Sequence, residues 1–176
     1  MARIHYSMAG RWFVVMMLAG VLAQSANAAP PREWPELEAG NSEVSVEARV
    51  KALQYLLRAR GQKVVVDGKF GTQTVRAVKN FQRRHRLIAD GVVGNATWEV
   101  LIVKVKSGSK GNAVRAAQTL LKHQGYDVPV DGIFGAQTKA AVLKFQSRTG
   151  RTKDGIVGPY TWCELVGGTV GQVIGD

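Results

Sequence analysis

The sequence predicts an all-α protein built from two tandem, compact three-helix modules joined by a short linker. An internal repeat is the first observation, because VDGKFGTQT at residues 66–74 returns as VDGIFGAQT at residues 130–138, a shift of 64 positions. This shift holds without a gap over residues 50–101, and about half of the paired residues are identical, as in repeat proteins. The second observation is that apolar residues recur at helical spacing inside each copy.

The first helix of each module is expected over about residues 46–60 and 112–124. Val50, Leu53 and Leu57 lie at positions i, i+3 and i+7, which places them in one apolar stripe along a helix. The second copy repeats this spacing. Each module therefore begins with a helix that buries one face.

Two Asp-Gly turns divide each module, and a further helix follows each turn. Aspartate and glycine favour tight turns, because the carboxylate can accept backbone N–H groups and glycine adopts positive φ. Phenylalanine and tryptophan near these turns are expected to carry the core of so small a module. The residues assigned to turns and core are Asp67, Gly68, Phe70, Phe81, Asp90, Gly91, Trp98, Asp131, Gly132, Phe134, Phe145, Asp154, Gly155 and Trp162.

The segments outside the repeats are expected to differ in kind. Residues 1–28 combine early arginines, an apolar run and a small-x-small site, which predicts a secretory signal peptide cut after Ala28. The apolar run is shorter than the roughly 20 residues that a membrane span needs. The division expected for the chain is 1–28 signal peptide, 29–45 acidic Pro-rich tether with little to bury, 46–103 module 1, 104–111 linker, 112–167 module 2 and 168–176 flexible Gly-rich tail. A weaker alternative folds the tether back onto the repeats, with Trp34 as its anchor.

The chain is strongly basic, with a formal net charge of +11. A basic protein is attracted to polyanions such as nucleic acid, anionic lipid or anionic wall polymers, and export makes nucleic acid the least suitable partner. Only one cysteine is present, so no intrachain disulfide can form. Cys163 follows a tryptophan in an apolar stretch, and burial is expected for it.

Each copy has the form V-x-x-x-Q-x-L-L-x-x-x-G, then D-G-x-F-G-x-Q-T-x-x-A-V-x-x-F-Q, then D-G-x-V-G-x-x-T-W-x-x-L. This pattern resembles the peptidoglycan-binding module (peptidoglycan-binding domain 1-like) that accompanies catalytic domains in many bacterial cell-wall hydrolases. It covers nearly all of the chain after residue 45. The resemblance implies a three-helix fold and non-catalytic binding of peptidoglycan.

No arrangement of residues in the sequence indicates an enzyme, a metal or another cofactor. His85 and His123 stand in no ligand motif, and a catalytic zinc needs three protein ligands. Cys163 has no histidine near it in sequence to activate it. The aspartates of the Asp-Gly turns could be read as glycosidase carboxylate pairs, but turn formation explains them.

Peptidoglycan offers sugar faces, amides and carboxylates, so polar residues without a core role are the candidates to bind it. Glutamine and arginine side chains present in both copies are chosen for this reason, together with glycines at helix starts, where free N–H groups can receive a carboxylate. The candidate ligand-binding residues are Gln54, Gly71, Gln73, Gln82, Arg84, Gln118, Gly135, Gln137, Gln146 and Arg148.

Three functions remain open from the sequence. The first is an exported, non-catalytic protein that binds peptidoglycan, and anionic wall polymers, through both modules. The second is an accessory or regulatory subunit of a separate wall hydrolase, or an enzyme whose machinery is not recognisable. The third is a protein-interaction module on the same fold. The expected location is secreted or wall-associated (periplasmic if the source has an outer membrane), with no membrane contact after signal removal.

Overall fold

The computed structural model describes residues 32–40, 44–167 and 169–170. The predicted signal peptide and its cleavage site lie outside these residues. Within them, the described chain forms six helices and two very short strands. The elements are β1 (Arg32–Glu33), α1 (Val44–Ala59), α2 (Thr72–Arg84), α3 (Asn95–Leu101), α4 (Asn112–His123), α5 (Ala136–Arg148), α6 (Pro159–Leu165) and β2 (Thr169–Val170). The predicted all-α class and the three helices of each module are confirmed.

The predicted core aromatics are buried. Phe81, Phe145, Trp98 and Trp162 are at most 1 % exposed. Each lies on a helix that follows an Asp-Gly turn, among the residues that this helix buries. Burial of such large apolar side chains is the main stabilising contribution available to a module of this size.

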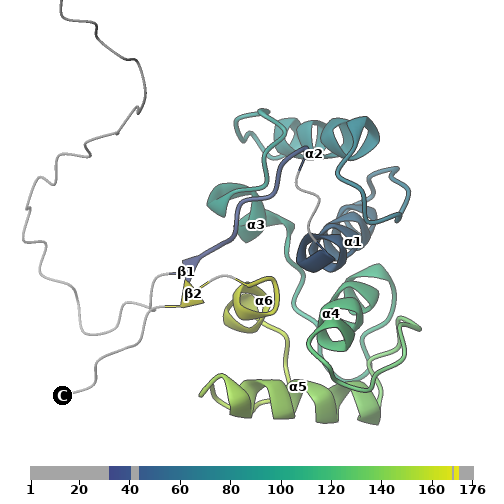
Figure 1. Cartoon of the computed structure of the whole chain (residues 1–176), viewed down its shortest axis with the longest axis vertical. Coiled ribbons are helices and arrows are strands. Elements are labelled where there is room, and N and C mark those ends of the chain that lie inside the picture. The colour runs from purple at the N-terminus through teal and green to yellow at the C-terminus, as the bar shows by residue number, and fades with distance from the viewer. Residues whose placement is uncertain (1–31, 41–43, 168, 171–176) are drawn as a thin grey trace, which may run out of the picture.

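The two modules share one core, which differs from the expectation of two modules joined only by a linker. Helices α1 and α4 pack side by side at the centre of the molecule, while α2 and α5 lie at opposite edges (Figure 1). Ala52 and Leu56 form a second buried stripe on α1, and Ala116 and Leu120 repeat it on α4. A helix that buries two faces can serve its own module with one and the neighbouring module with the other.

The segment before α1 is not a tether with little to bury, so that expectation is wrong for residues 32–40. Trp34 is 6 % exposed and stacks on Trp98 with 5.7 Å between ring centroids. Its indole N–H donates to the Glu99 carboxylate at 2.9 Å. Leu37 is buried and forms an isolated antiparallel bridge with Val93. The weaker alternative, in which Trp34 anchors this segment on module 1, is the one observed.

The expected linker also belongs to a module. Val105 is 2 % exposed and bridges Val157, as Leu37 bridges the corresponding valine of module 1. The Trp162 indole donates to the Val103 carbonyl at 2.8 Å, and the Trp98 indole donates to the carbonyl of Pro35 at the same distance. Each module is therefore completed by the extended segment that precedes its first helix.

Part of the expected loose tail is also ordered. Thr169 pairs with Glu33 and Val170 with Arg32, so that β1 and β2 form a two-stranded antiparallel ladder. The remaining tail residues, 168 and 171–176, lie outside the described chain. This ladder places the segment that completes module 1 beside the end of module 2 (Figure 1). Across the described residues, no helix combines the length and the apolar character that a membrane crossing requires.

Candidate ligand-binding grooves

Four of the candidate glutamines are structural, which corrects their assignment to ligand binding. Gln54, Gln82, Gln118 and Gln146 are at most 2 % exposed. The Gln146 amide nitrogen lies 2.7 Å from the Asp154 carboxylate, 3.0 Å from the Ile156 carbonyl and 3.3 Å from the Thr161 hydroxyl.

The same set of contacts occurs four times, twice in each module, and we call it the glutamine cluster. In each cluster the amide nitrogen contacts the aspartate, the carbonyl two residues later and a threonine at the start of the next helix. The amide oxygen accepts from the glycine N–H of the turn. The four clusters are Gln54–Asp67–Thr74, Gln82–Asp90–Thr97, Gln118–Asp131–Thr138 and Gln146–Asp154–Thr161. Each one ties a helix to the following Asp-Gly turn.

Three of the Asp-Gly turns favour the carboxylate form of their aspartate. The pKa values of Asp67, Asp90 and Asp131 lie below the ordinary value of 3.8. The main cause is a hydrogen bond from the backbone N–H two residues later, and the glutamine amide adds to it. The repeated geometry of turn and amide gives each of these aspartates a structural role.

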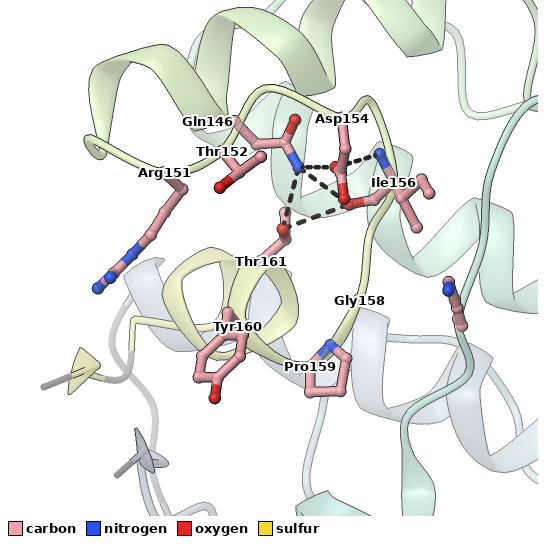
Figure 2. Close-up of a pocket in the computed structure, with 10 residues that line it drawn as sticks. Gln146, Arg151, Thr152, Asp154, Ile156, Gly158, Pro159, Tyr160 and Thr161 are labelled. Atoms are coloured by element: carbon pink, nitrogen blue, oxygen red, sulfur yellow. Dashed lines mark hydrogen bonds between the residues drawn. The ribbon is translucent and has the colours of Figure 1, made fainter. Parts of the chain in front are cut away.

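The α6 groove of module 2 is the principal hollow of the candidate site. It has a volume of about 470 Å³, which is within the usual range for small-molecule sites. Figure 2 shows Gln146 and Asp154 on one wall and Tyr160 and Pro159 on the α6 side. Lys104, from the extended segment before α4, also lines it.

Cationic and aromatic groups surround the α6 groove. Lys104 is exposed, whereas Arg151 is held by Glu164 through an ion pair of 2.6 Å. The guanidinium of Arg32 lies 4.7 Å from the centre of the Tyr160 ring. The Tyr160 hydroxyl is buried and has no hydrogen-bond partner among the described residues. The groove thus offers a positive charge and apolar ring surface beside a fixed polar wall.

Module 1 has the equivalent hollow, the α3 groove, at the same place. Its volume is smaller, about 260 Å³. Glu36 takes the place of Lys104, while Asn95 and Ala96 replace the proline and tyrosine of module 2. The exposed Ile88 lies where module 2 has a threonine. The two grooves therefore share their framework and differ in charge and in ring surface.

The backbone conformation at the starts of four helices does not require glycine. Gly71, Gly94, Gly135 and Gly158 precede α2, α3, α5 and α6 with φ between −88° and −94°. A Cβ atom at any of them would meet no heavy atom within 4 Å. Turn formation itself does not require glycine at these positions, because other residues also adopt this backbone. Gly94 and Gly158 line the α3 and α6 grooves.

The other candidates lie on the outer helices. Gln73 is exposed and accepts the Val65 N–H, and Gln137 is exposed and donates to the Asp127 carbonyl. Arg84 is exposed on α2. These side chains lie away from the α3 and α6 grooves, along hollows on α2 and α5. In the described ranges, no group of three or more His, Cys, Asp and Glu side chains is arranged to hold a metal ion.

The repeat pattern and the fold agree with a family model. The family described as "Putative peptidoglycan binding domain" matches residues 46–101 and 110–165, which together make up more than half of the chain. The chain belongs to this family. The two matches coincide with the two three-helix modules, and the expected resemblance is confirmed.

Curated relatives of this family member include cell-wall enzymes. The N-acetylmuramoyl-L-alanine amidase CwlL of Bacillus licheniformis is 32 % identical over 157 residues, covering 67 % of this chain and 42 % of that protein. The zinc D-Ala-D-Ala carboxypeptidase of Streptomyces albus G is 42 % identical over 77 residues, covering 41 % and 28 % respectively. The chain thus spans less than half the length of these relatives.

Among solved structures, a peptidoglycan-binding protein from Clostridioides difficile, in complex with glutamine hydroxamate, is 42 % identical over 36 % of this chain and 40 % of that chain. Its TM-score is 0.36. The N-terminal domain of SleB is 36 % identical over 37 % of this chain and 90 % of that chain, with the same TM-score of 0.36.

Sequence reasoning missed the α3 and α6 grooves, because each is closed by a segment outside the repeat frame. Glu36 and Lys104 line equivalent walls, yet they do not correspond under the 64-residue shift. Alignment of the short extended segments before each first helix, by Leu37 and Val105, could have indicated the relation.

Proposed function

We propose that this protein is exported and binds peptidoglycan without catalysing a reaction of its own. The α6 groove of module 2 is the main contact, and the α3 groove of module 1 adds a second contact of different chemistry. The observation that carries the proposal is that a member of this family has a hollow at the same place in both modules.

The chemistry of the α6 groove suits a peptide-bearing sugar polymer. Tyr160 and Pro159 offer apolar surface on which a sugar ring can pack. Lys104 is placed to attract a peptide carboxylate. Because Gly158 carries no side chain, a ligand can approach the backbone at the start of α6.

Two grooves on one rigid framework favour a repetitive ligand. Since α1 and α4 share a core, the distance between the α3 and α6 grooves is set by packing rather than by a flexible linker. Simultaneous binding of two sites raises apparent affinity when their spacing matches the polymer. The sequence predicted two modules joined by a short linker, whereas the shared core fixes their relative positions.

The hydrogen bonds of the groove wall support the proposal that the protein does not catalyse a reaction. Gln146, Asp154 and Thr161 on the groove wall are engaged with one another and with the turn backbone. A general acid or base has to reach a substrate proton, and these groups are occupied in holding the turn. Zymography on purified cell walls should show no clearing, whereas a cleared band at the protein's position would contradict non-catalytic binding.

The direct test is co-sedimentation of residues 29–176 with purified sacculi stripped of accessory polymers. Lys104→Glu and Tyr160→Ala should each reduce retention several-fold, since both alter the α6 groove. Lys106→Glu is the matched control, because Lys106 is exposed in the same segment and does not line the groove. Unchanged retention of both groove variants would move the site elsewhere on the molecule.

The relatives favour a second candidate, an accessory role for a separate wall hydrolase. Two of them are named as an amidase and a carboxypeptidase, and this chain matches less than half of each. If the protein recruits or guides such an enzyme, adding it to sacculi should change the rate at which a purified amidase releases peptides. An unchanged rate across a range of concentrations would remove this candidate.

A further inference from the structure

A separate hollow, the α2 groove, lies on the outer side of module 1. It has a volume of about 370 Å³. Gln62 and Lys63 line it from the turn after α1, while Gln73, Arg76 and Arg84 line it from α2. In Figure 1, α2 lies at the edge of the molecule opposite α5.

The α2 groove is strongly cationic. Lys63, Arg76 and Arg84 are all exposed along it, and no Asp or Glu is among its lining residues. Within the described chain, none of these three side chains takes part in an ion pair. Three like charges around one hollow repel one another, so an anion in the hollow would lower their electrostatic energy.

The groove also contains a buried donor that lacks an acceptor. Gln62 is 8 % exposed, and its amide nitrogen has no hydrogen-bond partner in the described structure. Leaving a buried donor unsatisfied costs about 1–3 kcal/mol, which makes such groups rare. Because Gln62 lines the cationic groove, a ligand bound there is placed to supply the missing acceptor.

The equivalent α5 groove of module 2 has lost these features. Tyr126 and Asp127 replace the glutamine and the lysine of the turn, and Ala140 replaces the first arginine. The remaining arginine, Arg148, donates to the Gln124 side chain at 2.8 Å and lies 5.4 Å from the Tyr126 ring centre. The α5 groove keeps one exposed cation, Lys144, where module 1 has Asn80. The set of three unpaired cations with an unsatisfied amide is therefore a property of module 1 and not a consequence of the shared fold.

We propose that the α2 groove of module 1 binds an oxyanion, supplied by a carboxylate of a wall peptide or by a phosphate of a wall polymer. Arg76 and Arg84 present planar guanidinium groups, which match carboxylate and phosphate oxygens, and Gln62 supplies a neutral donor. For its natural ligand the inference rests on the proposed wall binding. The ligand chemistry itself follows from the groove alone.

In the experiment, a protein of residues 29–176 is titrated with small-molecule probes. The ¹H–¹⁵N NMR signals of the Gln62 side-chain amide and of the arginine Nε–H groups are monitored. The probes are muramyl dipeptide (one free carboxylate), its amidated neutral form, and glycerol 3-phosphate. The carboxylate or the phosphate probe should shift the Gln62 and Arg76 signals, and the neutral form should not. The probe that saturates at lower concentration identifies the source of the oxyanion.

Matched variants separate a groove effect from a general charge effect. Arg76→Ala combined with Arg84→Ala should weaken binding of the effective probe tenfold or more. Arg58→Ala combined with Arg83→Ala removes the same charge from exposed positions outside the groove and should change affinity less than twofold. Gln62→Leu should weaken binding while the free protein stays as stable or becomes more stable, because the buried donor is removed.

Failure of this inference is distinguishable from failure of the proposed function. If no probe shifts the Gln62 signals, or if the neutral probe shifts them equally, the oxyanion site is overturned whatever the sacculi retain. Equal loss of affinity in the two arginine pairs would also overturn it. If the protein does not bind sacculi but these titrations give the expected shifts, the oxyanion site remains and its natural ligand is not part of the wall.

Discussion

At the scale of single residues, each buried glutamine connects a helix to the Asp-Gly turn that follows it. An amide side chain has both donors and an acceptor, so one glutamine can donate to the aspartate of an Asp-Gly turn and accept the N–H of its glycine. Gln118 contacts the Asp131 carboxylate, the Ile133 carbonyl and the Thr138 hydroxyl, and it accepts the Gly132 N–H. A residue that repeats in both copies can therefore be essential for structure while contacting no ligand.

Replacing such a glutamine should destabilise the protein strongly. Gln118→Leu keeps the approximate volume but leaves several buried polar groups without partners, which should lower the free energy of unfolding by about 2–4 kcal/mol. Gln137→Leu alters an exposed glutamine with one backbone hydrogen bond and should cost about 1 kcal/mol or less. Urea denaturation measures both. Equal losses would mean that the glutamine cluster contributes little.

The single cysteine should be inert in the folded protein. Cys163 is fully buried, and burial, the largest cause, raises the pKa of its thiol to about 11. Because the thiolate is the reactive form, a disulfide reagent at pH 8 should react about a hundredfold or more slowly with native than with urea-unfolded protein. Comparable rates in the two states would show that the end of α6 opens readily.

At the scale of elements, the Asp-Gly turns make the free energy of unfolding depend on pH. The folded-state pKa values of Asp67, Asp90 and Asp131 are lowered relative to 3.8. The stabilising contribution is therefore complete above the unfolded-state pKa and decreases as pH falls toward the folded-state values. The free energy of unfolding should be level between about pH 5 and 8 with respect to these groups and should fall below about pH 4. Urea denaturation at a series of pH values measures this dependence. Asp131→Asn should make the free energy of unfolding fall less steeply as the pH decreases. An unchanged pH dependence would show that the turn aspartates are not its cause.

The helices and turns were predictable because their signals are local and doubled. The stripe of Val50, Leu53 and Leu57 and the repeated Asp-Gly pairs required only spacing and turn chemistry. The packing of α1 on α4 was missed, although Ala52 and Leu56 recur on the second face of that helix in both copies. Two buried faces on one helix do not reveal which partner covers each.

The candidate site was less predictable than the fold, for a physical reason. A sequence does not distinguish buried from exposed amides, so it gives Gln54 and Gln82, which are buried, the same prediction as Gln73, which is exposed. Composition alone predicts a tether for residues 32–40, yet Trp34 and Leu37 dock this segment on module 1. Grooves formed by segments distant in sequence depend on such docking.

At the scale of the whole molecule, the shared core predicts one cooperative unfolding transition. Leu56→Ala, on the second buried face of α1, should lower the free energy of unfolding by about 2–5 kcal/mol and should lower amide protection in α2 and in α5 alike. Ile88→Ala, at a side chain that is 83 % exposed, should cost less than about 0.5 kcal/mol. Calorimetry measures the number of unfolding transitions, and hydrogen exchange measures the amide protection of each helix. Two transitions, or loss of protection in α2 only, would mean that the modules unfold independently.

The fixed arrangement also changes how isolated modules should be interpreted. Cutting the chain between α3 and α4 would expose the apolar stripe of Leu56 on one fragment and that of Leu120 on the other. Weak binding by such a fragment could then arise from poor folding rather than from loss of a second site. Point variants in the intact chain are the sound comparison, because they leave the α1–α4 contact in place.

The most direct test of wall binding through the α6 groove is retention of residues 29–176 on stripped sacculi at moderate salt. Gly158→Ala is the sharpest variant, because a methyl group there meets no protein atom within 4 Å but narrows the groove. It should fold normally, with a stability change of about 1 kcal/mol or less, and lose retention several-fold. The wild-type protein should be retained, and Gly135→Ala, at the equivalent helix start outside the groove, should bind like it. No retention of the wild-type protein, or equal retention of the wild-type protein and Gly158→Ala, would contradict wall binding through this groove.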